Sequence, residues 1–386
     1  MSEFKASGFR DEFGSGGPDL VGITTMTSPY YFVPPSGSTA ERPQDPPPGM
    51  LRFNTDIGRL EVWRNDHWAT IVGESPNLGD QNNTNSSGGT GTRGLIMGGE
   101  QPGRTNTIEY ITVDTLGSAQ NFGDLLDDTG RIGSLASRTR GFRGGGYQAP
   151  SNLDRIDFVT IASTGDATDF GNLTDSRKQL AGCSNQTRGV FAGGYDPTTK
   201  DVMDYITMAS SGDAIDFGNL VSPANRIAAC SSSVRGIFAG GAFSPGSPEG
   251  MNIINYVTIS STGDGQDFGD LVNPKFQYAG CSNTIRGVFG GARTTPDGSN
   301  LNSIDFITIA TTGNSQDFGD LTTNRTPQAA CSSSTRAIWA GGNISPAKQD
   351  TIDFVTIMTT GNAVDFGDMI TAGNNNAGCS NGHGGL

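Results

Sequence analysis

Carboxylates in close pairs are the residues of this chain best suited to hold a metal. Asp166 and Asp169 lie in one Gly- and Thr-rich segment, and Asp213 and Asp216 repeat the arrangement. Oxygen-rich turns of this kind can bind Ca²⁺. A later copy of the same segment has Asn314 in place of Asp166, however, and the sequence has no EF-hand or RTX spacing. We therefore expect no cofactor, and calcium is the one alternative that stays open.

The tripeptide Asp-Phe-Gly, which binds metal in protein kinases, occurs repeatedly, and one copy reads Asn-Phe-Gly. No Gly-rich nucleotide loop, strand lysine or His-Arg-Asp loop accompanies it, and a kinase has a single copy on an α/β scaffold. We expect a structural role, in which the Phe packs between neighbouring units, the Gly allows a tight turn and the carboxylate binds backbone amides. The aromatic residues are Phe122, Phe170, Phe217, Phe268, Phe318 and Phe366.

Histidine and cysteine give no catalytic or metal site. The two histidines, His67 and His383, lie in different regions, whereas a zinc site needs three or four N or S ligands and a Ser/His/Asp triad needs a placed base. An odd number of cysteines, one per repeat, fits neither a disulfide framework nor a CxxC pair. Because Leu135 takes the same position in one copy, we expect buried apolar thiols. They are Cys183, Cys230, Cys281, Cys331 and Cys379. We predict no catalytic residue and no enzyme.

An arginine opens the second apolar segment of every repeat. Six equivalent guanidinium groups could surround one face and bind an anion. They could equally pair with the carboxylates of the Asp-Phe-Gly motifs, because the planar guanidinium suits bidentate binding. We favour this structural pairing. The arginines are Arg93, Arg140, Arg188, Arg235, Arg286 and Arg336.

These residues recur because residues 92–386 consist of six copies of a unit of roughly fifty residues. Each copy has a Gly-Gly doublet after a short apolar run, and then a segment such as residues 304–309 in which apolar and polar residues alternate. Alternation of this kind is typical of half-buried strands. Turn residues separate four such segments, and none has helical periodicity. The sequence predicts an all-β fold with four short antiparallel strands per copy.

Six four-stranded copies suit a β-propeller. The first copy begins at its second strand, residues 93–99, and the last copy ends with residues 377–380, the segment that the first copy lacks. A strand from the C-terminal end can therefore complete the first sheet and remove two open edges. We predict a six-bladed β-propeller over residues 92–386, closed by this exchange of strands between the two ends.

The doublet after an apolar strand, with an aromatic residue on the fourth strand, resembles the kelch repeat. Kelch units usually carry Trp where this chain has the Phe of its Asp-Phe-Gly motifs, and often a Tyr after the doublet, matched here by Tyr147 and Tyr195. The resemblance covers roughly three quarters of the chain. It implies a kelch-like fold and leaves function open, because kelch-like rings serve as enzymes, adaptors and lectin-like modules.

The loops after the doublets differ in length and are rich in Pro and Gly. A rigid ring that presents such loops on one face makes a recognition surface. Tyr147, Tyr195 and Phe243 are candidates for stacking on a ligand such as a host-surface glycan or protein, and decoration without any ligand is the alternative.

The net charge of −14 argues against binding nucleic acid or an anionic membrane through a broad basic surface. The sequence has no apolar run long enough to span a bilayer, and residues 1–5 do not begin a signal peptide. We therefore expect no membrane insertion and synthesis in a cytoplasm. Glycine is abundant, with 57 residues, and turns and doublets account for the excess.

Two further regions precede the repeats. Residues 1–48 are rich in Gly, Pro and Ser and predict an extended docking arm, anchored by Tyr30, Tyr31 and Phe32; a leader without a partner is the alternative. Residues 49–73 predict a three-stranded β-meander. A meander this short has little core of its own, so we expect Trp63 and Trp68 to pack on another subunit or on the ring. Residues 74–91 predict a flexible neck.

The string LRFNT at residues 51–55, together with SPYYFVPPSGSTAERP at residues 28–43, resembles structural proteins of tailed bacteriophages, in particular the tail-fibre and virion proteins of marine cyanophages. The resemblance covers about seventy residues. It implies location in the virion after synthesis in the host cytoplasm and other virion structural proteins as partners, and it leaves a homo-oligomer as an open alternative.

The sequence leads to one main functional hypothesis: a non-enzymatic phage structural protein, such as a fibre, appendage or decoration, that displays its ring. One alternative is a propeller-type carbohydrate-active enzyme, which would place carboxylates at the axis, although the strand expected innermost has none. The other alternative is a kelch-like adaptor, although no familiar partner domain accompanies the ring.

Overall fold

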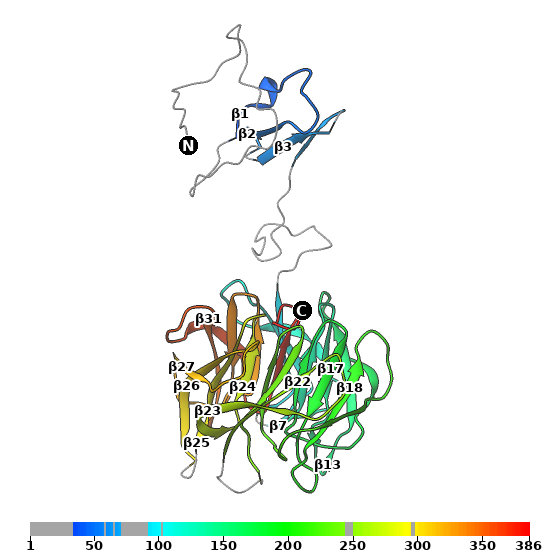
Figure 1. Cartoon of the computed structure of the whole chain (residues 1–386), viewed down its shortest axis with the longest axis vertical. Helices are drawn as coiled ribbons and strands as arrows, with labels where there is room; N and C mark the ends of the chain where they lie inside the picture. The colour runs from blue at the N-terminus through cyan, green and yellow to red at the C-terminus, as the bar shows by residue number, and fades with distance from the viewer. Residues whose placement is uncertain are drawn as a thin grey trace, which may run out of the picture. The chain divides into compact units, whose positions relative to one another are not determined.

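The computed structural model describes residues 34–57, 59–64, 66–70, 92–101, 103–243, 250–294 and 298–386. The chain divides into two compact units, Met1–Glu74 and Ser75–Leu386, and each is described by itself (Figure 1). Over the described residues the regular structure consists of strands and one 3-10 turn, η1 (Thr39–Glu41). The predicted all-β fold is confirmed. No helix among these residues is long and apolar enough to cross a membrane.

The first unit contains a small four-stranded sheet of β1 (Ser36–Gly37), β2 (Leu51–Asn54), β3 (Arg59–Trp63) and β4 (Trp68–Thr70). Strands β2, β3 and β4 form an antiparallel meander, as predicted, and β1 pairs with β2 in parallel. Residues 36–42 therefore belong to the folded unit, although the sequence predicted an extended arm up to residue 48. Strand β1 covers the edge of β2 that a three-stranded meander would leave unpaired.

In the second unit each copy of the repeat forms four antiparallel strands. We number the sheets 1 to 6 in the order of their Phe-Gly motifs, and the strand positions one to four in hydrogen-bonded order. The strands are listed below from sheet 1 to sheet 6. Position one holds β33 (Ala377–Ser380), β10 (Gly133–Ala136), β16 (Ala181–Ser184), β20 (Ala228–Ser231), β24 (Ala279–Ser282) and β28 (Ala329–Ser332). Position two holds β5 (Arg93–Met97), β11 (Arg140–Gly144), β17 (Arg188–Ala192), β21 (Arg235–Ala239), β25 (Arg286–Thr294) and β29 (Arg336–Ala340). Position three holds β8 (Thr107–Thr112), β14 (Arg155–Thr160), β18 (Val202–Thr207), β22 (Met251–Thr258), β26 (Asn300–Thr308) and β31 (Ala347–Thr356). Position four holds β9 (Gln120–Asp124), β15 (Thr168–Asn172), β19 (Ile215–Asn219), β23 (Gln266–Phe276), β27 (Gln316–Asp320) and β32 (Val364–Gly373).

Short strands extend the loops that follow the doublets. They are β6 (Glu100–Gln101), β7 (Gly103–Arg104), β12 (Tyr147–Gln148), β13 (Ser151–Asn152) and β30 (Asn343–Ile344). The long strand β23 also pairs with β25, so that sheets 4 and 5 are joined into one larger sheet.

The two ends of the second unit share sheet 1. Strand β33 pairs with β5, with Ala377 opposite Met97 and Cys379 opposite Leu95, and in Figure 1 the red and cyan ends of the unit meet there. The strand pairing predicted from the truncated first and last copies is confirmed. The position-one strands also lie side by side from β10 to β33, and β33 in turn lies beside β10. Every sheet therefore has a neighbour on both sides.

The hydrophobic core lies between successive sheets. One cluster joins Leu95 and Phe122 of sheet 1 to Ala136 and Val159 of sheet 2, and equivalent clusters follow at the later interfaces. A single sheet could not bury both faces alone, so the sheets are stable only together.

The cysteines belong to this core, and the prediction that they are apolar filler is confirmed. All five are free and buried, and Leu135 is buried at the sixth position. A Cβ added to Gly236 would lie 2.5 Å from the Sγ of Cys183, and one added to Gly287 would lie 2.5 Å from the Sγ of Cys230. At these two places the glycine that follows the position-two arginine thus makes room for the thiol of the preceding sheet.

A backbone seam joins the position-four strand of each sheet to a turn of the next sheet. The N–H of Gly165 donates to the carbonyl of Phe122 at 2.8 Å, and the N–H of Ala167 donates to the carbonyl of Asp124 at 2.8 Å. Between them, Asp166 Oδ1 accepts the N–H of Asp124 at 3.0 Å. The carbonyl of Phe366 accepts from the N–H of Gly117 in the same way, at 3.0 Å, where sheet 6 meets sheet 1.

The Phe and Gly of the motif make this seam possible. Phe122 is buried and meets the ring of Tyr110 edge to face, with centroids 6.0 Å apart, a favourable aromatic geometry. A Cβ on Gly123 would lie 2.3 Å from the carbonyl oxygen of Gly165. The expected packing of the Phe between units is therefore confirmed. The carboxylate that binds a backbone amide, however, belongs to the turn of the next sheet and not to the motif.

The predicted pairing of the six arginines with motif carboxylates is wrong. Arg93 Nη1 donates to the carbonyl of Ile161 in sheet 2 at 3.0 Å, and its guanidinium lies 4.7 Å from the ring centroid of Tyr110. Arg336 makes the same bond from sheet 6 to Val113 of sheet 1, at 3.1 Å. In each sheet the guanidinium lies over the aromatic ring of a residue in the position-three strand. It also lies beside a carbonyl at the end of a strand in the next sheet. The arginines do bridge neighbouring sheets, but they bind backbone.

We expect Gly171→Ala to destabilise the second unit by about 2–4 kcal/mol, because its Cβ would lie 2.4 Å from the carbonyl oxygen of Gly212. Gly212→Ala is the matched control. The two residues have φ of 150° and 156°, but a Cβ on Gly212 meets nothing within 4 Å, so only strain of about 1 kcal/mol should remain. Urea unfolding followed by circular dichroism measures both values. Equal losses would show that the close approach is not required.

Candidate functional site

The position-one strands line two small cavities. One, of about 50 Å³, is lined by the later halves of these strands and by His383, and the other, of about 60 Å³, is lined by their first halves. None of the lining residues is Asp or Glu. A glycosidase needs a pair of carboxylates at its reacting bond, and these cavities supply none.

Serine hydroxyls link the position-one strands in series. Each Oγ donates to the backbone carbonyl of the preceding sheet at 2.6–2.8 Å. The series runs from Ser380 through Ser332, Ser282, Ser231 and Ser184 to the carbonyl of Ala136. In sheet 2 the serine is displaced to Ser134, which donates to the carbonyl of Gly378 at 2.8 Å. These hydroxyls hold strands together and are not free to act as nucleophiles.

His383 lies beside this series, which the sequence did not predict. Its Nε2 is 2.9 Å from the carbonyl oxygen of Ala136 and 3.3 Å from Ser184 Oγ, and its Nδ1 accepts the N–H of Gly385 at 3.1 Å. Nε2 must therefore carry the proton, because a carbonyl can only accept. Burial lowers the pKa of His383 to about 4, so the ring is neutral at pH 7. A neutral ring with Nε2 already protonated cannot take a proton from Ser184, and the pair is not a catalytic dyad.

Five buried carboxylates and one buried amide lie at one equivalent place on the position-three strands. The six residues are Glu109, Asp157, Asp204, Asn255, Asp305 and Asp353. Several accept a backbone N–H of the preceding sheet: Asp204 from Thr174 at 3.2 Å, and Asp353 from Thr322 at 3.1 Å. The sequence shows them only as polar residues in an otherwise apolar strand. They join neighbouring sheets and do not face a substrate.

Cations lie beside most of these carboxylates. Asp204 lies 2.9 Å from Arg177 and Asp305 lies 2.9 Å from Lys275, both from the segment before a position-one strand. In sheet 4 Ala224 stands where sheet 3 has Arg177, and the neutral Asn255 stands where sheet 3 has Asp204. Among the described residues, four of the five carboxylates thus have a cation partner, whereas Glu109 and the neutral Asn255 have none. Burying a charge without a partner is costly, which favours the four pairs.

No metal site emerges. Among the described residues, no group of three or more His, Cys, Asp or Glu is arranged to hold an ion. Asp213 Oδ1 accepts the N–H of Asn172 at 2.9 Å, as Asn314 Oδ1 accepts that of Asp270 at 3.0 Å. One acceptor oxygen is all that the seam needs, which explains why Asp and Asn interchange there. Asp166 and Asp213, one member of each pair, thus have a structural role that does not involve calcium.

The other end of the position-one strands carries a rim of left-handed residues that are not glycine. The N–H of Gln179 donates to the carbonyl of Arg131 at 2.6 Å, and the N–H of Arg226 donates to that of Gln179 at 2.8 Å. Each rim residue directly precedes, or nearly precedes, a position-one strand. The rim consists of Arg131, Gln179, Arg226, Gln277 and Asn375, with φ between 55° and 63°.

Cations and aromatic rings gather at this rim. The ring centroid of Tyr147 lies 4.2 Å from the Nζ of Lys178, 4.4 Å from the guanidinium of Arg104 and 5.8 Å from that of Arg131. Tyr195 lies 5.5 Å from the same Nζ. Burial and the nearby Arg131 lower the pKa of Lys178. The sequence named both tyrosines as ligand-face candidates but missed the cations, which lie far apart along the chain.

The third ligand-face candidate belongs to the same end of the unit. Phe243 is 58% exposed and follows Ala242, whose carbonyl accepts the N–H of Asn225 at 3.0 Å. Asn225 directly precedes Arg226 of the rim. All three candidates therefore lie on loops that border one end of the position-one strands.

In the first unit the docking candidates have mixed outcomes. Tyr30, Tyr31 and Phe32 lie outside the described residues. Trp63 and Trp68 are half-buried and pack on each other, with ring centroids 5.6 Å apart. Whether they also contact another subunit or the ring stays a prediction.

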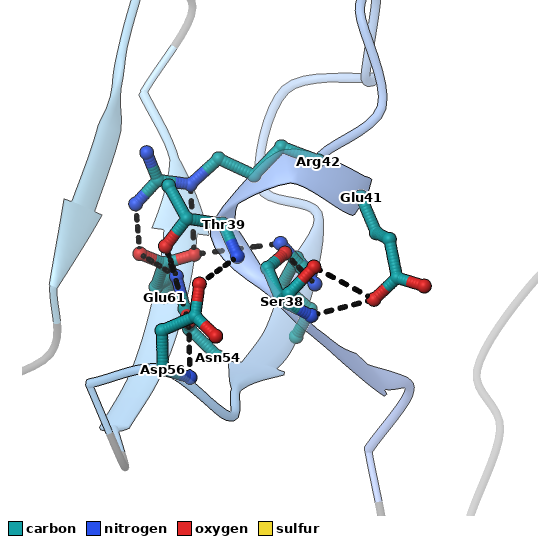
Figure 2. A network of polar contacts seen from close by, with 8 residues as sticks. Ser38, Thr39, Glu41, Arg42, Asn54, Asp56 and Glu61 are labelled. Carbon is teal, nitrogen blue, oxygen red and sulfur yellow. Dashed lines mark hydrogen bonds and ion pairs between the residues drawn. The ribbon is translucent and has the colours of Figure 1, made fainter.

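A buried carboxylate organises the first unit, as Figure 2 shows. Glu61 is fully buried and accepts hydrogen bonds from Arg42 through both carboxylate oxygens and from Asn54 at 3.0 Å. Arg52 lies 3.7 Å away. The bonds from Arg42 lower the pKa of Glu61, so it stays charged. Residues 38–42, which the sequence assigned to the arm, are thereby bound to the meander.

The structure thus defines a repetitive all-β protein with a small β-sheet unit before its six sheets. Compared with models of known protein families and with curated proteins, the sequence matches none.

We expect Arg177→Ala to destabilise the second unit by about 3–5 kcal/mol, because it leaves the buried carboxylate of Asp204 without a counter-charge. Adding Asp204→Asn should recover part of the loss, about 1–3 kcal/mol, because the double variant copies the Ala224 and Asn255 pair of sheet 4. Urea unfolding of the single and double variants tests this. Losses that simply add would contradict the pairing.

Glu109 is buried without a cation, and burial raises its pKa. A raised pKa means that the folded state favours the neutral carboxyl. The stability that the neutral group contributes is therefore complete below its ordinary pKa and is lost as the pH rises through the raised value. Glu109→Gln, which stays neutral, should exceed the wild type in unfolding free energy at pH 7 by about 1 kcal/mol and match it near pH 4. An equal difference at both pH values would contradict the assignment.

Proposed function

We propose that residues 92–386 form a six-bladed, kelch-like β-propeller closed by β33, and that the protein is a non-enzymatic structural protein of a tailed-bacteriophage particle. The N-terminal segment attaches the protein to other virion proteins, and the propeller is displayed as part of a fibre, appendage or decoration. Its loop face is available to a glycan or protein of the host surface.

The observation that carries the architecture is the interface between sheets 6 and 1. It repeats the contacts of the other interfaces: the arginine bond from Arg336 to Val113, the seam bond from Gly117 to Phe366, and the side-chain bond from the N–H of Ile370 to Glu109 at 3.0 Å. An open stack would have no reason to repeat these contacts between its first and last members. Repetition at the sixth interface favours a closed propeller.

The absence of an assembled reaction centre at the axis supports a binding role. The serines donate to backbone carbonyls, His383 has its Nε2 proton committed to a carbonyl, and the strand carboxylates lie between the sheets. A propeller-type carbohydrate-active enzyme would need carboxylates where these cavities have none. The virion assignment has separate support, the resemblance of residues 28–55 to phage structural proteins.

Immunogold labelling of purified phage particles tests the assignment, with an antibody raised against residues 92–386. We expect gold on the virions. Label confined to the cytosol of infected cells would overturn the proposal.

Two matched variants test the attachment. Glu61→Ala removes the buried carboxylate that binds Arg42 and should reduce incorporation into particles at least tenfold, because Arg52 is then left buried without a counter-charge. Glu41→Gln removes an exposed carboxylate of the same unit and should be incorporated normally. Equal incorporation of both would show that the folded first unit is not the attachment site.

A further inference from the structure

We propose that the rim at Tyr147 binds the carboxylate group of an acidic saccharide, held by Arg131, Lys178 and Arg226 with Arg104 beside them. The ligand class deepens the proposed function, because a host surface would present it, but the site itself is argued from its own geometry.

The first argument is the concentration of like charge in an acidic protein. The chain has a net charge of −14, yet three cations lie within 6 Å of the Tyr147 ring centroid. Arg226 is the rim residue after Gln179, and its backbone N–H donates to the carbonyl of Gln179. Like charges this close repel each other and are kept together only if something offsets the repulsion. A bound anion would do so.

Among the described residues, the protein's own carboxylates do not neutralise the cluster. Glu100 lies 3.5 Å from Arg131, and both side chains are partly exposed. Asp196 raises the pKa of Lys178 by its charge but is held by Ser176 Oγ at 2.8 Å. Two carboxylates therefore face four cations, and the excess of positive charge lies around the rings of the tyrosines.

The second argument is the backbone of the rim. Left-handed φ costs a residue with a Cβ about 1 kcal/mol or more, and glycine avoids that cost. This chain uses glycine at left-handed positions elsewhere, for example Gly145 and Gly193 of the doublets. At the rim it has Arg131, Gln179 and Arg226 instead, with φ of 63°, 61° and 55°. Retaining side chains at that cost indicates that the side chains are needed there.

The third argument is unused hydrogen-bonding capacity. Gln179 is 7% exposed, and its Oε1 has no hydrogen-bond partner among the described residues. The Nε atoms of Arg104 and Arg226 are buried and also without a partner. Buried polar atoms are normally paired. A ligand with hydroxyl and carboxylate groups supplies a donor for the amide oxygen and acceptors for the guanidinium groups.

The chemistry favours a saccharide over a nucleic acid. Binding a phosphate backbone takes an extended basic surface, and the rest of this acidic chain would repel it. A saccharide places one carboxylate among several hydroxyls and an apolar ring face. Amides and guanidinium groups suit the polar parts, and the exposed ring of Phe243 beside Asn225 suits the apolar face.

Calorimetric titration of the full-length protein with alginate, a carboxylated polysaccharide, tests the proposal. We expect binding that weakens as salt increases, and none to neutral dextran. Arg131→Gln and Arg226→Gln should each weaken alginate binding about tenfold, the loss of one charged hydrogen bond. Gln is already tolerated in this backbone conformation at Gln179, so both variants should fold.

Arg138→Gln is the matched control. Arg138 is exposed, in the turn at the opposite end of β10, and its substitution changes the net charge equally. It should leave binding unchanged. Three results would overturn the proposal: no binding of alginate, an equal loss in all three variants, or equal affinity for a single-stranded DNA oligonucleotide. The site and the virion assignment can fail separately, because immunogold labelling does not depend on alginate binding.

Discussion

The close approach of backbone between neighbouring sheets is the constraint on which the second unit depends. At each seam the carbonyl of a buried Phe accepts the N–H of a glycine in the next sheet, and the glycine after the Phe has no room for a side chain. The Phe fills the space behind the seam, and the position-two arginine binds the next sheet at another strand end. The Asp-Phe-Gly motif, which binds metal in protein kinases, therefore serves here to pack neighbouring sheets together.

The repeat made most of the fold predictable. Alternation of apolar and polar residues predicts the strands. The first copy lacks its first strand and the last copy ends with an extra one, so the sequence also predicts that β33 pairs with β5. The arginines were assigned the wrong acceptor for a physical reason: a sequence shows carboxylates, whereas every residue has a carbonyl, and only the fold brings one particular carbonyl within reach. The role of residues 36–42 was missed because a two-residue strand has no periodicity.

The candidate site was predictable only in part. Tyr147 and Tyr195 stand out because they follow the doublets, and variable loops in a repeat protein often carry binding residues. The cations were not predictable, since Arg104, Arg131, Lys178 and Arg226 lie far apart along the chain and on different sheets. The left-handed backbone of the rim could not be predicted either, because Arg and Gln are common surface residues and do not indicate this conformation. Comparison of aligned copies could have revealed the buried charge pairs, since Ala224 and Asn255 change together relative to Arg177 and Asp204.

Ala136 breaks the sequence of serines, and the break has a consequence for symmetry. Were all six strands alike, His383 would find the same surroundings at any of six places. The carbonyl of Ala136 accepts the hydroxyl of Ser184, and it also accepts the Nε2 proton of His383. His383 therefore binds at the one position-one strand that has Ala in place of the serine, and this substitution distinguishes one of the six strand positions from the other five.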